Sequence, residues 1–279
     1  MTAYVCHAHD LTPPLLNMNQ RLVDLGLPGI LENPDHLAAL TDEQIDELAA
    51  IRDEAADALE QDESNADLID TIYLAHMTLS SALFLRAIAS DLPVPDLPAA
   101  QVLARSWAGG LLISCDSDSV RDLIAPRSTL DVLTKAGLPA KADPELSFSL
   151  PPTRLAELIE LADDEVDDAS SREYFGSFWK IGQTEDGDAL CLDERADCAV
   201  VLLDAEWGYY AQQFVNSSVG HLLQCLEAWR TFEIDDTNEV EDALSRLERA
   251  IDRIDPRALT EGAFWFDVMA MVVEEEEEE

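Results

Sequence analysis

The chain has 279 residues and a formal net charge of -41 at pH 7, because 58 acidic residues outnumber 14 arginines and 3 lysines. Binding to the phosphate backbone of nucleic acids depends on clustered Lys and Arg, so this balance argues against a nucleic-acid partner. With 47% apolar residues the chain is not wholly disordered, and its length can bury a full core in one large domain or two smaller ones.

The acidity has two interpretations, and the composition leaves both open. An acidic surface can accelerate the encounter with a basic protein partner. It can also be a general adaptation to high salt, which the scarcity of lysine equally allows. The terminal run Glu274–Glu279 supplies only 6 of the 41 negative charges, so an acidic body remains without this tail.

The cysteines and the apolar stretches indicate a cytoplasmic protein. The five cysteines have no repeated spacing, and an odd number leaves one unpaired in any all-disulfide scheme, so a reducing compartment is the simpler context. The N-terminus lacks a basic region followed by an apolar run, which predicts no secretory signal. The most apolar window, Leu68–Ala89, contains Asp70, His76 and Arg86, and it predicts a buried helix rather than a membrane span.

Residues 1–98 are predicted to form a helical N-terminal segment. Thr41–Gln44 has the form of a capping box and begins a helix with a one-sided apolar stripe. Ala66–Ser90 is apolar on several sides, which predicts a second, central helix. Three prolines between Asp91 and Pro98 end that helix and indicate a boundary, followed by a connecting region over 99–127.

Glycine and proline set the expected ends of the next elements. Val102–Trp107 is expected to be a short helix and Gly110–Cys115 a short strand. From Thr129 a helix is expected to end at Gly137, which can adopt a left-handed cap. Pro151–Thr153 is expected to open another helix.

Four short apolar strand candidates, separated by short polar turns, follow between Tyr174 and Arg230, and this pattern predicts an antiparallel meander. The first three candidates are Ser177–Gln183, Asp188–Asp193 and Ala199–Asp204, and the fourth ends in Phe214–Ser218. A helix from about Ser218 to Trp229 follows, with Ser217 as its expected N-cap.

Two helices are expected at the C-terminal end. Asn238–Ile254 carries apolar residues every three or four positions, which predicts an amphipathic helix. Asp255 and Pro256 then predict an N-cap and a first-turn proline for a last helix. Its core-facing side chains are Leu259, Phe264, Trp265, Val268 and Met269. An acidic tail follows at 274–279.

The sequence contains no recognisable catalytic set, so we expect no catalysis, no cofactor and no metal. Cys6–Asp10 contains ligand-type side chains in a row, but no second cluster completes a metal site, and a flexible terminus is the preferred interpretation. Asp163–Asp168 offers paired carboxylates for acid–base chemistry or a divalent metal, although an acidic loop is the simpler interpretation. Ser217 and Ser218 lack the flanking glycines of a nucleophile elbow.

Four pieces of the C-terminal part carry a family resemblance through their order and spacing. They are LTKAGLP at Leu133–Pro139, FWKIG with ALCLD at Phe178–Gly182 and Ala189–Asp193, FVNSS at Phe214–Ser218, and DPRAL with a tryptophan at Asp255–Leu259 and Trp265. Through these pieces residues 128–272 resemble the SUKH superfamily of immunity proteins, most closely its fourth type, found beside bacterial polymorphic toxins. The resemblance implies that residues 128–273 form one α+β domain, with a mostly antiparallel sheet flanked by helices. It also implies a protein that binds and blocks a cognate toxin inside the producing cell without chemistry. The first 120 residues lie outside it.

The turn at Glu206–Gly208 is expected to place an aromatic side chain at the surface beside carboxylates, as at binding hot spots. The expected partner-binding residues are Asp186, Asp188, Glu206, Trp207 and Tyr210. The alternative for the aromatics is that alternate residues of this strand face the core, as we expect for Trp179, Trp229 and Trp265.

The leading hypothesis is a cytoplasmic immunity protein that uses an acidic surface to occlude the basic active-site region of a toxin. A second hypothesis is a regulatory adaptor with no toxin partner, built from the SUKH-like domain and the helical N-terminal segment. A third is an enzyme that uses the carboxylates of Asp163–Asp168 with a metal.

Overall fold

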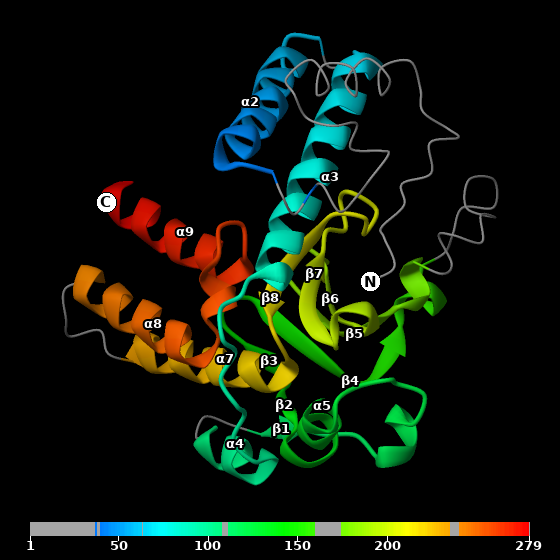
Figure 1. The fold of residues 1–279 in the computed structure, drawn as a ribbon, viewed down its shortest axis with the longest axis vertical. Coiled ribbons are helices and arrows are strands. Elements are labelled where there is room, and N and C mark those ends of the chain that lie inside the picture. The colour runs from blue at the N-terminus through cyan, green and yellow to red at the C-terminus, as the bar shows by residue number, and fades with distance from the viewer. Residues whose placement is uncertain are drawn as a thin grey trace.

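The computed structural model describes residues 37, 40–62, 64–107, 111–159, 174–234 and 240–278 (Figure 1). Its centre is a six-stranded antiparallel sheet in which each strand pairs with the next one in the chain. The strands are β3 (Lys141–Ala142), β4 (Leu146–Arg154), β5 (Phe178–Gln183), β6 (Ala189–Asp193), β7 (Ala199–Leu203) and β8 (Gln212–Asn216). This meander confirms the α+β fold class and the strand series predicted after Tyr174.

Helices cover the sheet, and every residue of β6 and β7 is buried. Three helices lie together on one side, left in Figure 1, and they are α7 (Val219–Ile234), α8 (Val240–Ile254) and α9 (Phe264–Glu278). The shorter elements are α4 (Ala100–Ser106), β1 (Leu112–Ile113), which pairs with β2 (Leu138–Pro139), η3 (Ser117–Val120), α5 (Arg127–Asp131), η4 (Val132–Ala136), η5 (Leu155–Glu157), η6 (Glu194–Ala196) and η7 (Pro256–Leu259). The core positions expected for Trp179, Trp229 and Trp265 are confirmed, since each is at most 7% exposed.

The N-terminal helices α2 (Asp42–Leu59) and α3 (Ala66–Ala89) pack against each other and bury a small core of their own. The predicted capping box is confirmed: Thr41 Oγ1 accepts from the amide of Gln44, and the Gln44 side chain accepts from the amide of Thr41. Among the described residues, α3 is the one helix long and apolar enough to cross a membrane by length and composition alone. Core helices share these properties, and α3 packs against α2 and β8.

α3 also closes the free edge of the sheet. β8 is the last strand, and its residue Gln212 turns both backbone groups away from β7 toward α3. The hydroxyl of Ser80 accepts from the Gln212 amide at 2.7 Å and donates to the Gln212 carbonyl at 2.6 Å. An edge strand left open would present unpaired backbone groups to other chains. Helix α3 is therefore built into the edge of the sheet.

A buried carboxylate joins three segments at the far end of β8. Asp255 Oδ2 accepts from the side-chain amide of Asn216 at 3.1 Å and from the backbone amide of Ser217 at 2.6 Å, and Oδ1 accepts from the Ser217 hydroxyl at 2.9 Å. Trp265 Nε1 donates to Asn216 Oδ1 at 3.0 Å. The end of β8, the start of η7 and the first turn of α9 are thereby held together.

This network corrects two predicted helix caps. Ser217 was expected to cap the following helix, but its side chain binds Asp255, and the adjacent Ser218 accepts from the His221 amide at 3.4 Å instead. Asp255 was expected to cap the last helix, but it makes no side-chain cap, and Pro256 begins only the short helix η7. Both side chains have stronger partners across the fold than within their own turn, because a buried carboxylate needs several donors.

Close backbone approaches require glycine at two positions of the family-like segments. Gly137 ends η4 with a φ of +84°, and a Cβ there would lie 2.5 Å from the carbonyl oxygen of Ile113. A Cβ on Gly182 would lie 2.3 Å from the carbonyl oxygen of Ser147 on the neighbouring strand. Only glycine allows these contacts without a shift of the backbone.

The helix predicted to open at Pro151–Thr153 is wrong, because these residues belong to strand β4. The prolines lie where the register between β4 and β5 shifts, between Phe148 and Thr153. Proline has no N–H to donate, and at such an irregularity the pairing between the strands does not need one. Only the short turn η5 follows, and the predicted positions from 160 to 162 lie outside the described residues.

We predict that Asp255→Ala lowers the free energy of unfolding by about 3 kcal/mol or more, because it leaves one buried and two half-buried donors without their acceptor. Urea unfolding at pH 7 measures this loss. Asp252→Ala on the exposed face of α8 is the matched control and should change stability by about 0.5 kcal/mol or less. Equal effects of the two substitutions would contradict the assigned role of the network.

Candidate partner-binding site

Two turns meet at one end of the sheet, and both contain predicted binding residues. The turn between β5 and β6 carries Asp186 and Asp188, and the turn between β7 and β8 carries Glu206. Asp188 Oδ1 accepts from the backbone amide of Ala205 at 2.9 Å, which ties the two turns together. Burial raises the pKa of Asp188, the Ala205 amide opposes this shift, and the charges of Asp204 and Asp186 add to it.

The turn between β7 and β8 is shaped by one carboxylate. Asp204 Oδ1 accepts from the backbone amides of Glu206 at 2.9 Å and Trp207 at 3.2 Å. Tyr209, a non-glycine residue, adopts a φ of +67° within this turn. Glu206 and Asp186 are exposed at the tips of their turns, so both carboxylates face solvent.

Trp207 packs against α3. Its ring stacks on His76 with centroids 5.0 Å apart and lies 5.6 Å from the ring of Tyr73. His76 Nε2 lies 3.6 Å from Asp204 Oδ2. Burial lowers the pKa of His76, and the nearby Asp204 carboxylate partly opposes this shift. Helix α3 thus supports the turn from which Glu206 projects.

Tyr210 points to a different environment. It stacks on Tyr174 at 5.5 Å and lies 5.0 Å from Phe175. Four of the five predicted residues, Asp186, Asp188, Glu206 and Trp207, therefore gather around the two turns, whereas Tyr210 joins an aromatic cluster. That any of the five contacts a partner stays a prediction.

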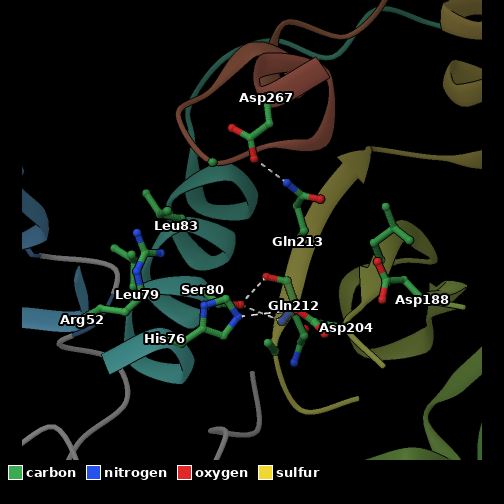
Figure 2. Close-up of a pocket in the computed structure, with 13 residues that line it drawn as sticks. Arg52, His76, Leu79, Ser80, Leu83, Asp188, Asp204, Gln212, Gln213 and Asp267 are labelled. Atoms are coloured by element: carbon green, nitrogen blue, oxygen red, sulfur yellow. Dashed lines mark hydrogen bonds and ion pairs between the residues drawn. The ribbon is translucent and has the colours of Figure 1, made fainter. Parts of the chain in front are cut away.

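A cavity of about 230 Å³ opens beside these turns, between α3 and β8 (Figure 2). Its walls come from α2, α3, the strands β7 and β8 and the start of α9. Its polar lining residues are Arg52, His76, Ser80, Asp188, Asp204, Gln212, Gln213 and Asp267, and its apolar ones include Leu79, Leu83, Leu202 and Ala211. Only Asp188 was predicted as a binding residue, because the others come together through contacts between distant segments.

Asp267 lies at the upper end of this cavity, where α9 begins (Figure 2). Its Oδ2 accepts from the side-chain amide of Gln213 at 2.6 Å. Burial raises the pKa of Asp267 to about 6, the Gln213 hydrogen bond opposes this shift, and the charge of Glu261 adds to it. Across the described ranges, no cation forms an ion pair with Asp267.

Ser218 and His221 form a hydroxyl–imidazole pair, which sequence reasoning missed. His221 Nε2 lies 2.9 Å from the carbonyl oxygen of Pro95, which can only accept, so Nε2 carries a hydrogen. In the neutral ring Nδ1 then accepts from the Ser218 hydroxyl at 2.8 Å. Both side chains are buried, and the pair ties the proline-rich segment to the start of α7.

Two segments of the sequence contain several side chains of the types that bind metals. Cys6–Asp10 and Asp163–Asp168 both lie outside the described residues. Within the part that is described, no three His, Cys, Asp or Glu side chains are grouped so as to hold a metal ion.

Residues 98–271 match the family model described as SUKH-4 immunity protein. The chain belongs to the SUKH-4 immunity protein family. Proteins of this family neutralise toxins by binding them and are generally non-catalytic. The match begins at residue 98, ahead of residue 128 where the resemblance was placed, and it leaves α2 and α3 outside. No curated protein and no solved structure matches the chain.

The family-like segments contribute to the fold rather than to the exposed turns. Gly137 and Asn216 lie in close backbone contacts or buried hydrogen bonds, as described above, and Trp179 Nε1 donates to Glu194 at 2.8 Å. Asp193 is buried in a paired hydrogen bond with Arg195, at 2.9 Å for each bond. The segments that carry the sequence resemblance thus contain residues that build the sheet and its supports in this chain.

We predict that Asp267→Asn stabilises the protein near neutral pH. The folded-state pKa lies above the ordinary 3.8, so stability from this group is complete below about pH 4 and is lost as the pH rises through about 6. Asparagine keeps an oxygen for Gln213 and removes the buried charge. The expected gain at pH 7.5, allowing for solvent screening, is about 1 kcal/mol. Thermal unfolding from pH 4 to 8 measures it, and a gain that does not shrink toward pH 4 would contradict the prediction.

Proposed function

We propose that this protein neutralises a cognate toxin by covering a basic region of it, in the cytoplasm and without catalysis, cofactor, nucleic acid or membrane. Membership of the SUKH-4 immunity family supports the toxin-binding role. The observation that carries the choice of surface is the convergence of two acidic turns on one end of the sheet, joined by Asp188 and supported by α3.

The acids of the two turns differ in how far they are exposed. Asp186 and Glu206 are exposed, and long-range attraction to a basic toxin would raise the association rate. Asp188 is half-buried and holds the turns together through Ala205, so its substitution would disturb the surface itself. The exposed pair is therefore the better probe of partner binding.

The toxin is identified first, by using the intact protein as bait in the organism that encodes it and collecting what elutes only at raised salt. Recovery of a basic toxin domain encoded nearby supports the proposal. Recovery of only housekeeping proteins, in a gene neighbourhood without a toxin, contradicts it and favours the adaptor.

We predict that Asp186→Lys combined with Glu206→Lys slows association with that toxin about tenfold or more at low salt, with a smaller effect at 0.5 M salt because exposed charges are screened. Stopped-flow or surface-based kinetics measure the rate. The control is Glu248→Lys with Asp252→Lys on the exposed face of α8, which makes the same change in net charge. If both pairs slow association equally, overall charge rather than this surface controls the encounter.

A further inference from the structure

The cavity beside the turns is formed jointly by the family domain and the N-terminal segment. His76, Leu79, Ser80 and Leu83 line it from α3, which lies before residue 98, where the family match begins. The opposite wall comes from β7, β8 and α9, inside the match. The Ser80 hydrogen bonds to Gln212 fix the separation of the two walls. The site therefore depends on a part of the chain that the family model does not cover.

We propose that this cavity receives one basic side chain of the toxin, an arginine or a lysine, and that Asp267 is its counter-ion. The inference rests on the proposed function, because it names the chemistry that the partner presents at the same end of the sheet.

The size of the cavity fits a single side chain. Pockets for drug-sized ligands and cofactors have volumes of about 300–1,000 Å³, and this one has about 230 Å³. The space is therefore smaller than a pocket for a drug-sized ligand, and it can admit a group of the size of one side chain. It also opens to solvent beside exposed turns, where a partner's side chain can enter.

The lining suits a side chain with an apolar stem and a charged head. Leu79, Leu83 and Leu202 offer apolar surface to methylene groups, as arginine and lysine stems require. At the head, Asp267 is a carboxylate whose bound donor is the neutral amide of Gln213. A guanidinium or ammonium group beside it would form a charge-assisted hydrogen bond in a half-buried site.

The cations already in the cavity wall do not fill this role. Arg52 is bound to Asp53 on its own helix at 2.9 Å, and His76 lies by Asp204 at the lower end. Glu261, near Asp267, adds negative charge, and its contact with Arg86 is long, at 3.9 Å. Asp267 is thus a half-buried charge that destabilises the folded chain and that an incoming cation would stabilise.

This arrangement predicts that one substitution has opposite effects on stability and binding. Asp267→Asn should raise the unfolding temperature near neutral pH and weaken binding of a basic side chain. A variant that only damaged the fold would lower both, so the two readouts separate the proposed role from misfolding.

The direct test uses a small probe. ¹⁵N-labelled protein is titrated with N-acetyl-arginine amide, and N-acetyl-citrulline amide serves as the neutral control of nearly the same shape. The expected result is a saturable shift of the Gln213 side-chain amide and the Ser80 and Gln212 backbone amides with the arginine probe alone. The shift should persist in Asp252→Asn and be lost in Asp267→Asn. Equal shifts with the citrulline probe, or shifts unaffected by Asp267→Asn, would overturn the inference.

The toxin complex separates this inference from the proposed function. In that complex Asp267→Asn should raise the Kd about tenfold or more, and Asp252→Asn less than about twofold. An unchanged Kd in Asp267→Asn, with the lysine substitutions in the turns still effective, would overturn the cavity inference and leave the proposed function standing. If Asp267→Asn abolished the shift caused by the arginine probe but left the Kd for the toxin unchanged, the cavity would bind arginine without serving the toxin, and the inference would likewise be overturned.

Discussion

The buried carboxylate of Asp255 is the constraint on which the rest of the structure depends. It accepts three hydrogen bonds from Asn216 and Ser217, and the Asn216 oxygen in turn accepts from Trp265. These bonds fix the end of β8 against the first turn of α9. Gln213 precedes Asn216 on β8, and Asp267 follows Trp265 on α9. The same network therefore positions the two residues that form the upper wall of the cavity. A carboxylate buried without such donors would cost several kcal/mol, so these segments are positioned together.

The family signature and the binding surface are separate properties of this chain. The glycines, Trp179, Asn216, Asp255 and Trp265 of the family-like segments are all used inside the fold, in close approaches and buried hydrogen bonds. Asp186 and Glu206, in contrast, are exposed at the tips of their turns. Binding residues are often carried by exposed loops that a rigid scaffold positions. Membership of the family therefore supports a toxin-neutralising role, and the choice of the turns as the contact surface belongs to the proposal.

Much of the sheet could be predicted from the sequence, because the meander depends on local patterns. Apolar runs and short polar turns defined β5 to β7 almost to the residue, and the capping box at Thr41 is a contact within one turn. The errors arose where a distant partner competed with a local rule: Ser217 and Asp255 bind each other instead of capping helices, and Pro151 lies in an irregular strand. The candidate site divides in the same way. Turn chemistry indicated the exposed acids, whereas Asp267 and Ser80 enter through contacts between segments far apart in the chain.

The burial of individual acids bears on why the chain is so acidic. A general adaptation to high salt accounts for exposed carboxylates, which remain hydrated. It does not account for Asp188 and Asp267, whose pKa values are raised first of all by burial. Buried charges are screened little by salt, so high ionic strength would not remove their unfavourable effect on stability. Asp188 has a structural reason to be there, in its bond to Ala205. Asp267 contributes a destabilising charge to a cavity of side-chain size. In the proposed complex a cation from the partner would stabilise this charge, whereas salt adaptation offers no explanation for it.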